Sequence, residues 1–187
     1  MASIDNFSKL CVHTQTTKPW TIEECISHFS AAGIKGISIW RHLLEGKDLK
    51  SIKAMLDAHQ MEVVSLVRGG FFPAVDAEQR DLALEDNRLA IDQAAALGAP
   101  LVVLVCGADP RQSLEISLQQ IQKGITALIP HAQITGSSWP LNLYTPCMPE
   151  TNPLWSLLGK PTIFVKQLLP FGWASPSMCT IFGGTTN

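Results

Sequence analysis

The chain has 187 residues, of which 46% are hydrophobic, and its 14 Lys and Arg against 16 Asp and Glu give a net charge of -2. This length fits one domain with a sizeable core, and the balanced charge argues against the basic surface of a nucleic-acid binder. No apolar stretch reaches the roughly 18 residues that a membrane span needs, so we expect no membrane partner. Residues 1–9 lack an apolar signal segment, and the five cysteines are scattered without a CxxC pair, so we expect a cytoplasmic protein with reduced thiols.

Strands and helices are predicted to alternate from the start of the chain. Residues 8–14 form a short β-branched run typical of a strand, and the next helix begins at a capping box made by Thr21 and Glu24. The apolar residues of that helix share one face as far as Gly33, which fits a left-handed cap. A second strand is predicted over 35–40.

The alternation continues through the middle of the chain. A helix over 48–59 leads to a strand over 62–67, which we expect to end in a flexible loop at 68–70. A long amphipathic helix follows over 76–97. The next strand, 100–106, shows no polar alternation, so both of its faces must be buried, as in a parallel sheet.

A last helix is predicted over 114–134, where Pro130 either ends it early or kinks it. Residues 1–136 therefore form four βα units, an α/β pattern with parallel strands and right-handed crossovers. Two closures fit this pattern, an open doubly wound sheet or half of an eight-stranded barrel. The absence of GxGxxG after the first strand and of any GxxxxGK motif argues against nucleotide binding.

Residues 137–187 have a different composition. They hold seven of the 12 prolines and three of the five tryptophans, but their only charged side chains are Glu150, Lys160 and Lys166. So few charges cannot easily cover a solvated surface. We therefore divide the chain into a domain over 1–136 and an irregular tail over 137–187 that is disordered or out of frame.

Four segments of the domain carry a family resemblance. They are GISIWRH (36–42), SLVRGGFFP (65–73), EDNRLAIDQAAALGAPLVVLVCGADP (85–110) and GITALIPHAQITG (124–136). These segments resemble sugar phosphate isomerase/epimerase proteins, which are xylose-isomerase-like TIM barrels. The resemblance covers residues 7–136 and implies the N-terminal half of that barrel, a partial (β/α)8 fold of about four βα units followed by an irregular tail. It implies a sugar or sugar phosphate as the small-molecule partner.

The resemblance also implies metal-assisted chemistry in the intact family. A divalent metal (Mn²⁺, Mg²⁺ or Zn²⁺) would lie at the C-terminal mouth of the barrel, and a carboxylate base would move a proton through an enediol. The carboxylate and His ligands come from later strands, beginning with a strand-five motif like E-P-L-H-P. Where that strand is expected, residues 137–149 read SSWPLNLYTPCMP. We therefore expect this chain to bind no metal and to be a truncated, inactive form, which leaves its status as an enzyme uncertain.

A one-nucleotide slip in the reading frame after Gly136 would explain this misfit. If each codon of residues 137–148 is regrouped to start on the last base of the preceding codon, permitted codons encode K-L-A-L-E-P-L-H-P-M, the missing motif. Residues 177–187 regroup in the same way to D-V-Y-H-I-W-W-D-D, which resembles the family's strand-six Asp motif. The ligand Glu codon would straddle Leu141 and Asn142, and neither binds a metal well. The alternative is a divergent tail that folds differently.

Candidate site residues follow from the rule that barrels carry functional groups at the C-terminal ends of strands. His13 ends the first strand and either lines the pocket, polarising a sugar hydroxyl, or serves as a hydrogen-bonded wall residue. Trp40 ends the second strand and either stacks on a sugar ring or packs in the core. Cys106 ends the fourth strand as a small spacer beside the substrate rather than a nucleophile.

Arg68 is the strongest binding candidate, because a guanidinium matches a phosphate or carboxylate bidentately. Gly69 and Gly70, which follow it, would allow a close approach of the backbone to the substrate. We expect Arg41 to be solvated or salt-bridged and Asp86 to belong to a solvated helical face.

Two other functions stay open. Apurinic-site endonucleases share this barrel, but they need a basic mouth facing DNA, which the charge balance does not favour. A half barrel could instead be a non-catalytic module that self-associates, or binds a partner, through its open strand edges. Isomerase turnover, salt-sensitive DNA binding and a well-folded dimer distinguish the three functions.

Overall fold

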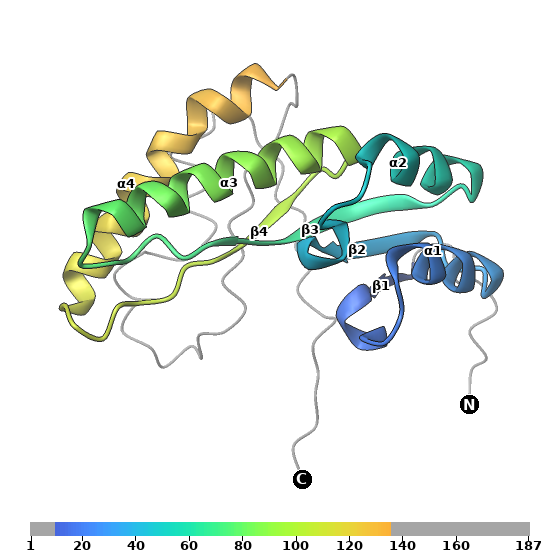
Figure 1. Cartoon of the computed structure of the whole chain (residues 1–187), viewed down its shortest axis with the longest axis horizontal. Helices are drawn as coiled ribbons and strands as arrows, with labels where there is room; N and C mark the ends of the chain where they lie inside the picture. Colours follow the sequence, from blue (N-terminus) through green and yellow to red (C-terminus); the bar gives the residue numbers. More distant parts are fainter. Residues whose placement is uncertain (1–9, 136–187) are drawn as a thin grey trace, which may run out of the picture. The chain divides into compact units, whose positions relative to one another are not determined.

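The structure is a computed structural model of the chain, and it describes residues 10–135. The predictions for residues 1–9 and 137–187, including the reading-frame hypothesis, lie outside the described residues. Within 10–135, strands and helices alternate as predicted (Figure 1). No helix of this part is long and apolar enough to cross a membrane.

The described part consists of four βα units with short 3-10 turns after the first two strands. The strands are β1 (Cys11–His13), β2 (Gly36–Trp40), β3 (Glu62–Gly70) and β4 (Val102–Val105). The helices are α1 (Ile22–Ala31), α2 (Leu49–Ala58), α3 (Ala77–Leu97) and α4 (Leu114–Ile134), and the turns are Thr14–Thr17 and Arg41–Leu44.

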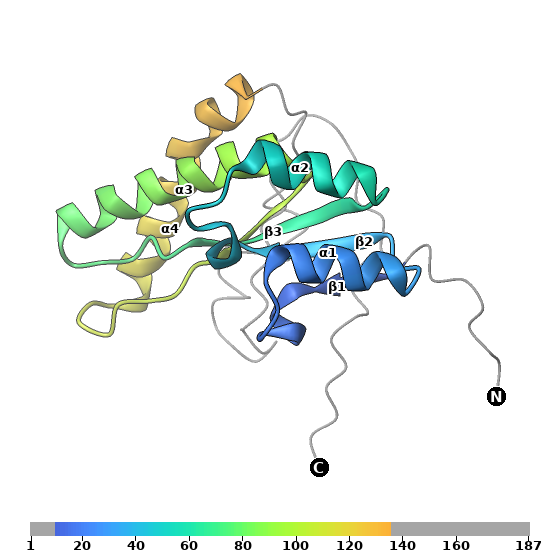
Figure 2. The ribbon, with the colours of Figure 1, turned by 45° about the vertical axis from the view of Figure 1, so that its right-hand side comes forward.

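The strand order decides between the two predicted folds, an open doubly wound sheet and half of an eight-stranded barrel. Every pairing is parallel, and the order across the sheet is β1-β2-β3-β4, the same as the order along the chain. An open doubly wound sheet changes direction at a switch point, whereas a barrel adds each strand beside the preceding one. The helices follow the same order, since α1 packs on α2, α2 on α3 and α3 on α4. Figure 2 shows α2 and α3 along the same side of β3. The described residues therefore form part of a (β/α)8 barrel.

Local sequence signals set the helix ends. The predicted capping box of α1 is present, because Glu24 N–H donates to Thr21 Oγ1 (3.2 Å) and Thr21 N–H donates to Glu24 Oε2 (2.8 Å). Gly33 follows α1 with a φ of 77°, as the predicted left-handed cap requires. Pro130 does not end α4 early, because it removes a single amide donor close to the end of a 21-residue helix that runs on to Ile134.

The predicted loop at 68–70 is wrong, because these residues continue β3. Gly69 and Gly70 pair with β4. The buried side chain of Asn87 adds hydrogen bonds to both the N–H and the carbonyl of Gly70. Glycine has a weak strand propensity of its own, so this ladder and the Asn87 amide hold the segment extended.

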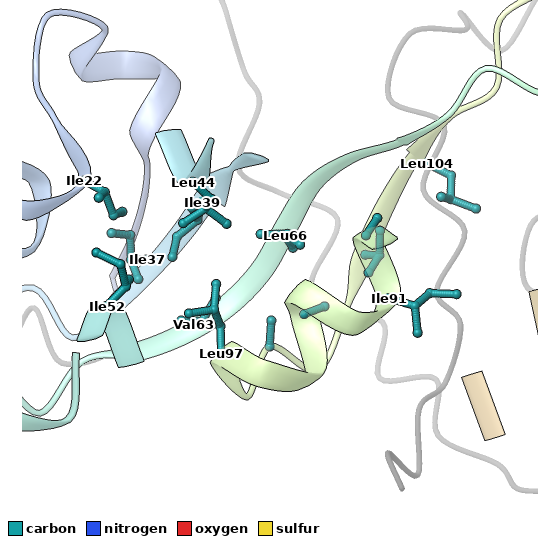
Figure 3. Packing of buried hydrophobic residues seen from close by; sticks show 14 of the residues in the cluster. Ile22, Ile37, Ile39, Leu44, Ile52, Val63, Leu66, Ile91, Leu97 and Leu104 are labelled. Carbon is teal, nitrogen blue, oxygen red and sulfur yellow. The ribbon is translucent and has the colours of Figure 1, made fainter. Parts of the chain in front are cut away.

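The core lies between the sheet and its helices (Figure 3). Ile37 and Ile39 of β2 and Ile22 of α1 are each 0% exposed. Burial of each such side chain contributes about 1.5–3 kcal/mol, which fixes the strands that carry the site. Ser38 alternates with the two isoleucines and therefore faces the other side of the sheet, where its hydroxyl lies 2.6 Å from that of Ser65.

Candidate substrate-binding site

The C-terminal ends of the parallel strands share one edge of the sheet, the edge where barrels carry their sites. His13 and Trp40 are the last residues of β1 and β2, Arg68 lies near the end of β3, and Cys106 directly follows β4. Contacts join His13 to Trp40, Trp40 to Arg68, and Arg68 to Phe71. We call His13, Trp40, Arg68 and Phe71 the mouth cluster. It unites three predicted site residues with one that the sequence did not single out.

The side chains of His13 and Trp40 are joined by a hydrogen bond. The indole Nε1–H of Trp40 donates to His13 Nε2 at 2.9 Å, and the rings meet edge to face. Accepting at Nε2 requires the neutral tautomer with its hydrogen on Nδ1, so the 3.4 Å contact from Gln15 N–H to Nδ1 is not a hydrogen bond in this tautomer. Burial lowers the pKa of His13, which also favours the neutral ring. The imidazole therefore positions Trp40, and the predicted contact of His13 with a substrate stays a prediction.

Arg68 lies on a bulge in β3. The pairing with β4 skips from Val67 to Gly69, so Arg68 has no partner residue in that strand. Its guanidinium packs on aromatic rings, with Cζ 4.5 Å from the ring centroid of Phe71 and 5.8 Å from that of Trp40. Among the residues that the structure describes, the exposed guanidinium has no hydrogen-bond acceptor. Its donors are therefore available to a ligand.

Phe71 has an unusual backbone conformation. Its φ is 57°, in the left-handed region that few residues other than Gly, Asn and Asp adopt. Its N–H donates to Val105 O at 2.8 Å, while the side chain stays 45% exposed. A bulky, exposed residue in this conformation costs free energy, and such strain is typical of functional sites. No feature of the sequence pattern identified it.

A second arginine supports the mouth cluster. Arg41 donates to both carboxylate oxygens of Asp86 at 2.8 Å and to Gln93 Oε1 at 2.7 Å, which ties the end of β2 to α3. Its Nη1 also donates to the carbonyl of Arg68 at 3.1 Å. The predicted salt bridge of Arg41 is confirmed. Asp86 is half-exposed, as a solvated face requires, but it also anchors Arg41, and a separation of 45 residues gave no sequence signal for this pair.

Asn87 of α3 holds the end of β3. Its Oδ1 accepts from Gly70 N–H at 2.7 Å, and its Nδ2 donates to the carbonyls of Gly70 at 2.8 Å and Ala83 at 2.7 Å. A Cβ added to Gly69 would lie 2.5 Å from Asn87 Oδ1. This packing alone requires glycine at position 69, and the predicted contact of Gly69 with the substrate stays a prediction.

Cys106 is 7% exposed at the end of β4. Burial raises its pKa to about 11, so its sulfur is a protonated thiol at neutral pH. A protonated thiol is a poor nucleophile, which agrees with the small-spacer interpretation. Its contact with the substrate stays a prediction.

Polar side chains lock the loops that follow β3 and β4, which run side by side in Figure 1. Asp109 accepts from Arg111 Nη2 at 2.7 Å and from Val75 N–H at 3.0 Å. The hydrogen bonds from Arg111, and then that from Val75, hold the pKa of Asp109 well below its usual range. Gln120 of α4 bonds to both the N–H (3.0 Å) and the carbonyl (3.1 Å) of Ala74. These hydrogen bonds fix the backbone of the two loops that follow β3 and β4.

The described residues do not fit a metal site. Within residues 10–135, no three His, Cys, Asp or Glu side chains converge. His13 Nε2 accepts from Trp40, and Asp109 is bonded to Arg111. The ligands that the resemblance implies belong to the strand-five segment after Gly136, which lies outside the described residues.

Comparison with known proteins agrees with this fold. The family model described as xylose isomerase-like TIM barrel matches residues 26–137. Among solved structures, protein SMc04130 from Sinorhizobium meliloti 1021 is 33% identical, with a TM-score of 0.66 over 72% of this chain and 49% of that one. The chain thus spans about half the length of that relative. No curated protein matches the sequence.

Two sugar epimerases are similar in fold at lower identity. The 3-keto-D-glucoside 4-epimerase YcjR from E. coli is 19% identical, with a TM-score of 0.62 over 85% of this chain and 65% of that one. A D-psicose 3-epimerase, crystallised in the presence of D-fructose, is 13% identical, with a TM-score of 0.58 over 71% of this chain and 50% of that one. Because the family model covers more than half of the sequence, the chain belongs to the xylose isomerase-like TIM barrel family.

Proposed function

We propose that the chain carries the substrate-binding part of a sugar isomerase or epimerase that acts on a sugar or sugar phosphate. The observation that carries this proposal is the mouth cluster, which presents two aromatic rings and a guanidinium at the C-terminal edge of a xylose isomerase-like sheet. The two structurally similar epimerases, one named for a keto-glucoside and one for psicose, support a carbohydrate substrate.

The chemistry of the mouth cluster suits a sugar. Aromatic faces stack on the C–H-rich face of a sugar ring, and the hydrogen bond to His13 already orients Trp40, so little side-chain freedom is lost on binding. The donors of Arg68 bond to substrate oxygens. Gly69 and Cys106 complete the proposed wall as small residues beside it.

Turnover needs a base and, by family resemblance, a divalent metal such as Mn²⁺, Mg²⁺ or Zn²⁺. Four carboxylates of the described residues near this edge are already bonded: Asp48 and Asp76 cap α2 and α3, Asp86 binds Arg41, and Asp109 binds Arg111. We therefore propose that the 187-residue chain has no isomerase activity by itself and binds no catalytic metal. The missing groups would be encoded in the neighbouring frame beyond Gly136.

Two proteins test this proposal. One is the 187-residue chain, and the other keeps residues 1–136 and reads the following codons in the neighbouring frame. Each is incubated in D₂O with neutral and phosphorylated ketoses and aldoses and with Mn²⁺, Mg²⁺ or Zn²⁺. Exchange of a sugar C–H proton is followed by NMR. We expect exchange with the frame-restored protein and none with the 187-residue chain.

Each arm of this experiment has a contradicting result. Metal-dependent exchange by the 187-residue chain would show that its own residues supply the chemistry. A folded, frame-restored protein that leaves every sugar unchanged would argue against the isomerase or epimerase function. The nucleotide sequence of the gene through and beyond codon 136 tests the frame slip independently of activity.

We further propose that the 187-residue chain self-associates. β1 and β4 lie at the edges of the four-stranded sheet, and edge strands present backbone groups that another strand can pair with. Size-exclusion chromatography with light scattering should then give a folded dimer. A stable monomer across micromolar concentrations would contradict this proposal.

A further inference from the structure

We propose that Arg68 is an anion anchor, which binds a phosphate or carboxylate group carried by the sugar. The inference rests on the proposed function and narrows its substrate to an anionic sugar derivative. It is argued from the hydrogen bonding, the strand register and the backbone conformation around Arg68.

Arg68 differs from the other arginines in the hydrogen bonding of its guanidinium. Arg68 is the one arginine whose guanidinium has no hydrogen-bond acceptor among residues 10–135, and it rests on aromatic rings instead. The guanidinium groups of the others all bond to carboxylate, amide or carbonyl oxygens: Arg41 to Asp86 and Gln93, Arg80 to Ala74 and Val75, Arg88 to Glu85, and Arg111 to Asp109. Within the described part of the chain, four arginines thus have oxygen acceptors, and the donors of Arg68 have none.

Arg68 lies at a register shift near the end of β3. A residue on a strand bulge points away from the regular ladder, and bulges are frequent beside binding sites. The carbonyl of Arg68 is fixed from the side by Arg41, whose own charge is paired with Asp86. The net positive charge at this strand end therefore belongs to Arg68.

Phe71, which contacts Arg68, has a positive φ. Its left-handed backbone is unfavourable for a phenylalanine, and Gly, Asn or Asp would adopt it more readily. This conformation accompanies a ring 4.5 Å from the Arg68 guanidinium. A side chain that lowers stability and yet forms a platform for an unpaired cation points to selection for binding.

These features fit an anion better than neutral hydroxyls. A planar guanidinium can make two parallel hydrogen bonds to a phosphate or carboxylate, and the charge assists both bonds. The guanidinium already rests on the rings of Phe71 and Trp40, so less side-chain freedom is lost when an anion binds. Phosphate and carboxylate share this chemistry, so the test must separate them.

The experiment measures ligand affinity by calorimetry with the whole 187-residue chain. The ligands are glucose 6-phosphate, glucuronate, neutral glucose and inorganic phosphate. We expect one of the two anionic sugars to bind more tightly than glucose by about tenfold or more, because charge-assisted hydrogen bonds are the strong ones. The preferred sugar tells whether the natural group is a phosphate or a carboxylate.

Variants locate the binding. Arg68→Gln should weaken the preferred anionic sugar by about tenfold to a hundredfold and leave glucose unchanged, and Arg68→Lys, which keeps the charge but loses the planar fork, should fall between. Arg88→Gln, the same charge change at an arginine of α3 that is paired with Glu85, should bind like the parent chain. Circular dichroism checks that each variant folds. If Arg68→Gln does not fold, the decision rests on Arg68→Lys.

Phe71→Asn separates a binding role from a structural one. Asparagine tolerates the left-handed backbone, so its urea midpoint should equal or exceed that of the parent chain. Loss of the aromatic platform should nevertheless weaken the anionic sugar by about threefold. A variant that loses stability and keeps full affinity would contradict the role given to Phe71.

Equal affinity of the parent chain for glucose and both anionic sugars would overturn the anchor, as would unchanged binding by a folded Arg68 variant. This failure is distinguishable from failure of the proposed function. If the frame-restored protein turns over neutral sugars, and Arg68→Gln leaves the KM for them unchanged, only the anion-binding role of Arg68 is contradicted. If anion binding depends on Arg68 but the frame-restored protein shows no turnover, only the isomerase or epimerase function is contradicted.

Discussion

Neighbouring strand ends of this sheet are built in opposite ways. Where β1 and β2 end, His13 and Trp40 pair their polar atoms with each other, and burial keeps the imidazole neutral. Where β3 ends, the guanidinium of Arg68 has no acceptor in residues 10–135, and Phe71 beneath it has a strained backbone. Groups that the protein satisfies by itself serve the fold, whereas unsatisfied groups on a strained support are available to a ligand. We therefore propose that Arg68 at β3 recognises the charged group of a ligand, while His13 at β1 holds Trp40 at β2 in place beside it.

The largest effect tests what holds the β3 end in place. Asn87→Ala removes three hydrogen bonds and leaves the buried N–H and carbonyl of Gly70 without their side-chain partner. We expect a loss of about 2–4 kcal/mol in the free energy of unfolding, measured by urea denaturation. Leu89→Ala, a change of a half-exposed residue on the same helix, serves as the control and should have little effect. If the two variants lose equal stability, the Asn87 amide does not hold this strand end.

The next effect concerns the link from β2 to β3. Arg41 bonds to Asp86 and to the carbonyl of Arg68, so it connects the two kinds of strand end. Arg41→Met, Asp86→Asn and the double variant form a thermodynamic cycle. We expect a coupling of about 1 kcal/mol between the two side chains, since Asp86 is half-exposed and water screens the pair. Additive effects of the two changes would show that the ion pair does not support the mouth cluster.

The smallest effect is a pH dependence at the β1 end. Burial lowers the pKa of His13, so the unfolded chain takes up a proton first as the pH falls below about 6.5, and stability then decreases. The decrease should level off once the pH passes below the lowered pKa of the folded state. Because the ring is half-buried and water screens its charge, we expect this contribution to be smaller than that of the Arg41–Asp86 pair. Urea unfolding at several pH values should show a shallower acid-side slope for His13→Gln, and identical slopes would contradict the buried, neutral imidazole.

Much of the fold was predictable because its signals are local. The capping box of Thr21 and Glu24 is a pattern four residues long, and it forms as the sequence indicates. The unbroken apolar run at 100–106 contains β4, which is paired in parallel with β3 as predicted. Such features depend on neighbouring residues, so a single sequence is enough to find them.

The end of β3 was not predictable because its causes are tertiary. Residues 68–70 have the composition of a loop, yet pairing with β4 and the Asn87 side chain, 17 residues from Gly70, make them a strand. The left-handed conformation of Phe71 leaves no trace in the residue type, which disfavours it. Arg68 was found from its chemistry alone, while its bulge and its aromatic support emerge only when distant segments meet.

The central claim is that, of the five arginines in the sequence, the one without an acceptor among residues 10–135, Arg68, binds an anionic ligand. The most direct measurement is a titration of the ¹⁵N-labelled chain with the anionic sugar that it prefers, monitored at the arginine Nε–H resonances. We predict that the Arg68 signal shifts with saturation while those of Arg41, Arg80, Arg88 and Arg111 stay in place. An unmoved Arg68 signal, or a larger shift at another arginine, would contradict the account.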